Sequence, residues 1–257
     1  TGEIRALVGA NGAGKSTLMK VFAGANPDYT GEVYLNDKVV ELRTPMAAKK
    51  LGIQIVYQEV DMALVPTLSV AENVMLNDMV MSAKGKPLMN WAQLRTDAKR
   101  VLEKLHIDVN VRTLVQDLSL AQKQMVLIAR AIANECNFLI LDEPTAGQDY
   151  RHYTEIMEFL KKLNEEYGIT IIMITHDMHL MLEYTNRAVV IADGRLLADT
   201  APAAVLTDDA VADRAYLKKT SLYDLAVRCG IAEPTQFVER FIGYERQMRA
   251  AEREEEA

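Results

Sequence analysis

Disulfide frameworks and histidine-based metal centres are both disfavoured, because the sequence has little of either residue type. Its 257 residues include two cysteines, Cys136 and Cys229, and four histidines. The cysteines have no CxxC spacing, so they indicate free thiols in a reducing compartment rather than structural bridges. His176 and His179 lie three positions apart. We interpret them as unrelated side chains rather than as a pair of metal ligands.

Long hydrophobic runs are also missing. The longest apolar stretches, such as residues 171–174, are far shorter than the roughly 20 residues that a membrane-spanning helix requires. The first residues do not resemble a signal peptide, because they lead almost directly into a strand and a glycine-rich loop. We therefore expect a soluble protein that reaches a membrane only through a partner.

The sequence also lacks an excess of positive charge. The chain carries 29 basic and 36 acidic residues, which gives a formal net charge of -7. Sequence-independent binding to nucleic acid requires a basic surface, so we expect no nucleic-acid partner. The remaining composition, 49% hydrophobic and 25% charged, is that of an ordinary globular protein.

Short apolar strands alternate with helices in both halves of the chain. Continuous apolar strands separated by helices indicate a parallel sheet that is covered on both faces. The predicted strands of this kind are residues 4–8, 53–57, 138–141 and 169–174. Two hairpins are expected as well, one around Asn36-Asp37 and one through Asp193-Gly194, a dipeptide favoured in tight turns. The sequence thus predicts an α/β fold.

The middle of the chain lacks any strand pattern. Between residue 61 and about residue 126 we expect helices, the clearest over residues 91–105 with Asn90 as its N-cap, and a loop at residues 84–87. This stretch is predicted to be an all-helical subdomain inserted into the α/β core. The expected division is core over residues 1–60, helical subdomain over 61–125, core again over 126–205, and a helical tail over 206–257.

A glycine-rich loop with a lysine follows the first strand. Residues 9–16, Gly-Ala-Asn-Gly-Ala-Gly-Lys-Ser, match the G-x-x-x-x-G-K-[ST] pattern between a strand and a helix expected over about residues 16–25. Glycines let successive backbone N–H groups surround phosphate oxygens, and the helix N-terminus adds partial positive charge. In this pattern Lys15 reaches the β- and γ-phosphates and Ser16 ligates Mg²⁺. The alternative is a glycine-rich turn with a chance lysine.

The predicted phosphate-binding residues form one continuous segment. They are Asn11, Gly12, Ala13, Gly14, Lys15, Ser16 and Thr17.

A pair of carboxylates ends a later strand. Asp142 and Glu143 follow the apolar residues 138–141, and ligands of open α/β sheets bind at such strand ends. We predict that Asp142 holds Mg²⁺ and that Glu143 acts as a general base on the attacking water. Two acidic residues after a strand are common, so this prediction depends on the glycine-rich loop being present too.

Further motifs follow in the order that ABC ATPases show. Gln58 follows a strand just before the helical stretch, and Leu118-Ser119-Leu120-Ala121-Gln122 stands where the LSGGQ signature would be. Ala146-Gly147-Gln148-Asp149 takes the place of the D-loop, and His176 follows a strand as the switch histidine does. Over about residues 1–205 the sequence therefore resembles ABC ATPases.

The resemblance implies a P-loop NTPase core of three layers that binds ATP and Mg²⁺ and hydrolyses ATP to power a bacterial importer. Such cassettes work in pairs, identical or different, and dock on integral membrane subunits at the cytoplasmic face of the plasma membrane. The groove for these subunits would lie after Gln58.

Roles also follow from the resemblance. Lys15, Gln58, Glu143 and His176 would be catalytic, with Gln58 also sensing Mg²⁺ and the attacking water. Across the dimer, Ser119 and Gln122 would touch the partner's γ-phosphate, and Asp149 would cross the interface.

The signature departs from the family pattern, because Leu120 and Ala121 replace its two glycines. The same residues also fit a capping box, Ser119-x-x-Gln122, at a helix start, and both interpretations can hold together. A nucleotide-binding switch with little or no turnover is therefore an alternative function. A soluble ABC protein of translation or DNA repair is a weaker alternative, given the acidic charge balance.

The resemblance is also uneven along the chain. Residues 1 to about 141 resemble the first cassette of a sugar importer, and residues from about 145 onward resemble the cobalt- and vitamin-type energy-coupling-factor ATPases. A natural hybrid and an engineered fusion both explain this. The family's first strands, with the aromatic residue that stacks on adenine, would precede residue 1, so we expect a fragment.

Overall fold

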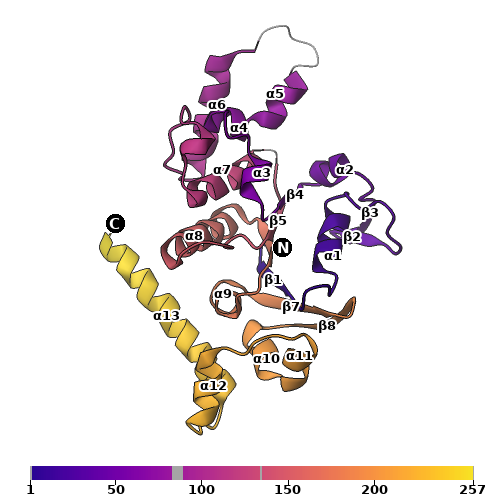
Figure 1. Ribbon diagram of the computed structural model, residues 1–257, viewed down its shortest axis with the longest axis vertical. Coiled ribbons are helices and arrows are strands. Elements are labelled where there is room, and N and C mark those ends of the chain that lie inside the picture. The colour runs from indigo at the N-terminus through magenta and orange to yellow at the C-terminus, as the bar shows by residue number, and fades with distance from the viewer. Residues whose placement is uncertain (1, 83–88, 134, 257) are drawn as a thin grey trace. The chain divides into compact units, whose positions relative to one another are not determined.

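The computed structural model describes residues 2–82, 89–133 and 135–256 (Figure 1). The predicted loop at residues 84–87 lies outside them. The chain divides into two compact units. The first consists of residues 1–2 and 19–171, and the second consists of residues 3–18 and 172–257.

Parallel strands form the sheet of the first unit. β4 (Ile53–Val56) pairs with β5 (Phe138–Asp142) in parallel, with Ile55 opposite Ile140. The strand order here is β4-β5-β6, and β6 (Thr170–Ile174) continues into the second unit. The buried residues of β5 are Leu139, Ile140 and Leu141. Such strands require cover on both faces, as the sequence predicted.

Helices of the first unit pack on this sheet and on each other. α7 and α2 both contact β4, and α7 also contacts α3, α4 and α8. Their bounds are α2 (Pro45–Lys50), α3 (Val60–Ala63), α4 (Val70–Val74), α5 (Leu76–Ser82), α6 (Trp91–Lys104), the 3-10 helix η1 (Val115–Asp117), α7 (Leu120–Ile132) and α8 (Tyr150–Tyr167).

The helical character of the middle of the chain is confirmed for the described residues. Between Asp61 and Val126 their one β feature is an isolated bridge from Ser69 to Leu114. Asn90 caps α6 as predicted, since its side chain accepts the backbone N–H of Gln93 at 3.1 Å. The hairpin around Asn36-Asp37 is present as β2 (Val33–Leu35) and β3 (Lys38–Val40).

The second unit contains the neighbouring strands β1, β7 and β8, in that order. β1 (Ile4–Val8) pairs in parallel with β7 (Arg187–Ala192), and β7 pairs antiparallel with β8 (Arg195–Thr200) through the predicted Asp193-Gly194 turn. The sheet is therefore mixed, and the predicted α/β class is confirmed.

Helices also dominate the C-terminal part of the second unit. They are α9 (Met178–Tyr184), α10 (Pro202–Thr207), α11 (Asp209–Arg214), α12 (Ser221–Arg228) and α13 (Pro234–Glu256). α12 contacts α13. One apolar cluster joins β1, β7, α9, α10 and α13, which makes the tail part of the second unit's core.

One helix boundary differs from the sequence prediction. α1 (Lys15–Phe22) was expected to extend to Ala25, but Gly24 takes a left-handed φ of 66° and ends the helix earlier. A Cβ at Gly24 would lie 2.2 Å from the carbonyl oxygen of Thr44, so only glycine fits there. α7 begins at Leu120, directly after its N-cap Ser119.

Among the described residues, no helix combines the length and the apolarity that crossing a bilayer requires. Both cysteines are free thiols; Cys136 is half-buried and Cys229 is exposed. Burial raises the pKa of the Cys136 thiol to about 12.

The two thiols should therefore differ in reactivity. Because the thiolate is the nucleophile, Cys136 should stay unmodified by iodoacetamide at pH 8 while the exposed Cys229 is alkylated. Mass spectrometry should find one label on the folded chain and a second after denaturation. Cys229→Ser should abolish labelling of the folded chain, and rapid labelling of Cys136 would contradict its burial.

Candidate functional site

The glycine-rich loop is fixed by backbone angles that side chains disfavour. Gly9, Gly12 and Gly14 have φ values of 149°, 81° and 107°. A Cβ at Gly9 would lie 2.0 Å from the carbonyl oxygen of Ile191, whereas at Gly12 it would meet nothing within 4 Å. Gly9 is thus required by packing on the end of β7, and Gly12 by its backbone conformation in open space.

Lys15 is the first residue of α1 and its side chain folds over the loop. The ammonium donates hydrogen bonds to the carbonyl oxygens of Gly9 at 2.7 Å and Ala10 at 2.9 Å. The residue is only 6% exposed, which places a charge inside the loop rather than in solvent. The first turn of a helix presents N–H groups without intrahelical partners, so the loop combines backbone donors, a helix terminus and a fixed cation. This donor set suits a polyphosphate.

Four other predicted residues of the loop lie at its surface, whereas Ala13 is buried. Asn11, Gly12, Ser16 and Thr17 are exposed, so their polar groups are accessible from solvent. Ser16 follows Lys15 in the first turn of α1.

In the first unit, the end of β5 presents the two carboxylates. Asp142 is the last residue of the strand and Glu143 follows it, both half-buried. The Glu143 Oε2 accepts a hydrogen bond from the Gln58 side-chain amide at 3.2 Å. The structure therefore brings together two of the residues that the sequence predicted to act on the same water. Partial burial, and then the charge of Asp142, raise the pKa of the Tyr57 hydroxyl.

Glu143 occupies a strained backbone conformation. Its φ is 46°, in the left-handed region where a side chain clashes with its own backbone. Such strain persists where the surroundings impose it, and it concentrates at functional sites. Nothing in the sequence signalled this feature.

The predicted signature residues form a helix cap. Ser119 Oγ accepts the backbone N–H of Gln122 at 3.2 Å, and Gln122 Oε1 accepts the backbone N–H of Ser119 at 3.1 Å. The capping box is thus confirmed at the start of α7. Leu120 is 40% exposed beside it, while Ala121 is buried.

Asp149 and His176 both lie next to helix starts. Asp149 is the N-cap of α8, and the backbone N–H of His152, which donates to its carboxylate at 2.9 Å, lowers the pKa of Asp149. His176 is exposed between β6 and α9, in the second unit with the glycine-rich loop. The first unit holds Gln58, Ser119, Gln122, Asp142, Glu143 and Asp149.

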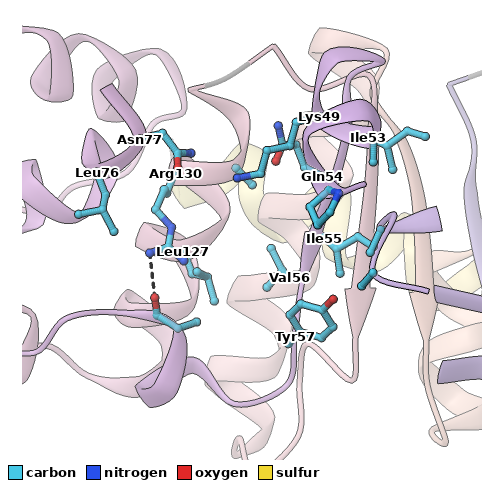
Figure 2. Close-up of a pocket in the computed structure, with 16 residues that line it drawn as sticks. Lys49, Ile53, Gln54, Ile55, Val56, Tyr57, Leu76, Asn77, Leu127 and Arg130 are labelled. Atoms are coloured by element: carbon cyan, nitrogen blue, oxygen red, sulfur yellow. Dashed lines mark hydrogen bonds between the residues drawn. The ribbon is translucent and has the colours of Figure 1, made fainter. Parts of the chain in front are cut away.

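A groove in the first unit is lined in part by Tyr57, the residue before Gln58 (Figure 2). Its volume is about 460 Å³, and its walls come from β4, α2, α5 and α7. Arg130 of α7 donates to the carbonyl oxygen of Ala63 at 2.8 Å and crosses one side of the groove, with Asn77 beside it. We expected the docking groove after Gln58, but α2 and β4, which line this groove, precede it, and neither Arg130 nor Asn77 was predicted. A signal was present, because Arg130 interrupts the apolar run of α7.

Among the described residues, no cluster of three or more His, Cys, Asp or Glu side chains suits a metal ion. The residues predicted for Mg²⁺ are of another kind, one hydroxyl, one amide and one carboxylate: Ser16, Gln58 and Asp142. Magnesium commonly binds through one or two carboxylates together with substrate phosphates, so this donor set fits it.

Comparison with known proteins decides the family. The sequence profile described as ABC transporter matches residues 1–146. The chain belongs to the ABC transporter family of ATP-binding domains. Its α/β core is accordingly the P-loop NTPase fold of ABC cassettes.

The ABC domain also has curated relatives in bacteria. A protein of Clostridium perfringens is 40% identical over 254 residues and one of Enterococcus faecalis is 40% identical over 268 residues; both are assigned by name to ABC transporter ATP-binding proteins. The alignments cover 95% and 96% of this chain but 42% of each relative, so the chain spans about two fifths of their length. Each alignment includes both sides of residues 141–145, where the resemblance was expected to change from one kind of ABC ATPase to the other.

Solved cassettes share the architecture. CbiO1 of Clostridium perfringens, part of the ABC transporter complex CbiONQ, is 30% identical, with a TM-score of 0.69 over 90% of this chain and 88% of that one. MJ0796, solved as a dimer in a post-hydrolysis state bound to ADP and Pi, is 29% identical, with a TM-score of 0.60 over 78% of this chain and 86% of that one.

Strain at Glu143 can be measured through stability. Replacing Glu143 with Gly or with Ala removes the same hydrogen bond to Gln58, but only glycine relieves the left-handed backbone. We expect Glu143→Gly to be more stable than Glu143→Ala by about 1 kcal/mol, net of glycine's greater freedom in the unfolded chain.

Urea unfolding of the two variants provides the comparison, and Glu155 provides the control. Glu155 is exposed inside α8, so Glu155→Gly should instead be less stable than Glu155→Ala by about 1 kcal/mol. If the two positions showed the same sign, Glu143 would not be strained.

Proposed function

We propose that this ABC domain binds and hydrolyses ATP with Mg²⁺ to power the uptake of a solute through partner membrane subunits. The observation that carries the proposal is the fixed loop around Lys15, whose ammonium is held by the carbonyl oxygens of Gly9 and Ala10. An amide-lined loop with a buried ammonium at a helix N-terminus has chemistry that suits a triphosphate better than a neutral ligand.

Binding would use the loop residues in order. The backbone N–H groups from Asn11 to Gly14 and the first turn of α1 would surround the phosphates, with Thr17 in that turn. Lys15 would exchange its carbonyl partners for phosphate oxygens. Ser16, Gln58 and Asp142 would hold Mg²⁺, which would supply charge neutralisation on the phosphates.

Hydrolysis would depend on the pair of Gln58 and Glu143. The Gln58 amide donates to Glu143 Oε2 at 3.2 Å, which orients the carboxylate that would accept a proton from water. The left-handed backbone of Glu143 adds to this fixed orientation. His176 would contact the γ-phosphate as negative charge develops there.

A second cassette, identical or different, would complete the site. Ser119, Gln122 and Asp149 would face the partner's nucleotide. Ser119 Oγ already accepts the N–H of Gln122, but a hydroxyl that accepts a hydrogen bond still has its own proton to donate to a phosphate. The dimeric state of the solved cassette MJ0796 supports this arrangement.

Membrane subunits would dock in the groove that Tyr57 lines, which would put the domain on the cytoplasmic face of the plasma membrane. Because Tyr57 directly precedes Gln58, docking would affect the residue that orients Glu143. CbiO1, a component of a transporter complex, supports a transport role. Import is inferred from the resemblance to sugar-importer and energy-coupling-factor ATPases.

A nucleotide-binding switch with little turnover is the second candidate. Leu120 favours it, because a 40% exposed leucine at the start of α7 stands where the family signature has a glycine. A side chain there would crowd a phosphate brought by the partner. Phosphate release measured with and without a partner cassette separates the two functions.

Lys15→Ala should remove ATP binding or weaken it severely, because the variant loses the cation held in the loop. Equilibrium titration with Mg-ATP measures this, and Lys20→Ala is the matched control, since Lys20 is an exposed lysine on the same helix. Micromolar affinity retained by Lys15→Ala would refute the assignment of the loop.

Glu143→Gln should retain ATP binding and lose turnover, since an amide cannot take the proton of the attacking water. In the presence of a competent second cassette, the variant should also accumulate an ATP-dependent dimer in size-exclusion chromatography. Glu155→Gln should behave like the wild type. Undiminished phosphate release by Glu143→Gln would show that another group is the base.

A further inference from the structure

Hydrogen bonds hold the beginning of α9, the helix that follows His176. Asp177 accepts the backbone N–H groups of His179 at 2.9 Å and Leu180 at 3.1 Å, which caps α9. The backbone N–H of Asp177 donates to the hydroxyl of the buried Thr175 at 3.0 Å. His176 therefore lies between two fixed neighbours, and its position follows that of α9.

The other end of α9 is held by α13, which together with α12 forms the last part of the C-terminal tail. Arg246 of α13 donates from Nη2 to the carbonyl oxygen of Leu182 at 2.8 Å, across 64 residues of sequence. The last carbonyls of a helix lack intrahelical partners and carry partial negative charge, so a guanidinium there satisfies both. This bond ties the tail to the helix of the switch histidine.

Apolar packing accompanies the bond. Met181 and Leu182 of α9 belong to one buried cluster with Val238 and Ile242 of α13. Val238, Ile242 and Arg246 are spaced by four residues, so they lie on one face of α13. That face therefore contacts α9 both through the cluster and through the guanidinium.

The His176 end of α9 borders open space. A cavity of about 860 Å³ is lined by residues 176–179 on one side and by tail residues that include Leu222, Leu225 and Phe241 on the other. The tail is thus anchored on the last turn of α9, while a cavity adjoins its first turn. α9 has seven residues and is about 10 Å long, so it moves as a rigid helix. A displacement at Leu182 therefore also displaces His176.

We infer that the C-terminal tail sets the position of His176 through α9, with Arg246 as a positioning residue, so that the state of the tail controls the rate of ATP cleavage. This inference rests on the proposed function for its effect on rate, but not for the coupling between Arg246 and His176. The two parts can therefore be tested separately.

Histidine NMR tests the coupling without nucleotide. Arg246→Met retains the apolar stem and removes the donor, Arg246→Lys keeps a donor, and Arg240→Met changes an exposed arginine of the same helix. In the full-length chain with labelled histidines, Arg246→Met should shift the ring signals of His176 and leave those of His106 and His152 in place. Arg246→Lys should lie closer to the wild type, and Arg240→Met should match it. An unmoved His176 signal in folded Arg246→Met would overturn the inference.

A double-mutant cycle tests the effect on rate. Arg246→Met should lower kcat by roughly fivefold with little change in ATP affinity, and the same change should have no further effect in a His176→Ala background. An equal loss in both backgrounds would mean a general structural effect and would contradict the positioning role. Absence of hydrolysis by the wild type together with a shifted His176 signal would reject the proposed function and leave the coupling in place.

Discussion

The backbone conformation of residues 9–14 is the constraint on which the rest of the site depends. Gly9 must approach the Ile191 carbonyl of β7 more closely than any side chain permits, and Gly12 and Gly14 must take left-handed angles. These turns direct the chain from β1 into α1 within a few residues, so Lys15 falls at the helix terminus with its ammonium over the loop. A residue with a Cβ at Gly9 would displace the loop from β7, and with it the donors that we propose to bind phosphate.

Several residues with predicted nucleotide roles also begin helices. Ser119 and Gln122 cap α7, Asp149 caps α8, and Asp177 caps α9 immediately after His176. Because a cap has fixed geometry, these side chains are oriented before any ligand arrives, which lowers the entropy cost of binding. It also means that substitutions at these positions affect helix stability, so a loss of activity alone would not prove contact with nucleotide.

Patterns of neighbouring residues predicted most helices and strands, but features that depend on contacts between distant residues were missed. The apolar runs of β1, β4, β5 and β6, the Asn90 cap and the Ser119-x-x-Gln122 box are properties of neighbouring residues, and the structure has all of them. The bond from Arg246 to Leu182 joins residues that no local pattern connects, and the left-handed φ of Glu143 is imposed by its surroundings. Gly24 ended α1 early for a tertiary reason too, the approach of Thr44.

The most direct test of the account is calorimetric titration of the wild-type chain with Mg-ATP. The account predicts saturable binding of one nucleotide per chain, because one glycine-rich loop with one lysine supplies the phosphate donors. ATP with Mg²⁺ should then also raise thermal stability, by about 2.7 kcal/mol at a hundredfold excess over Kd. A folded sample that shows no binding at millimolar Mg-ATP would contradict the account at its base.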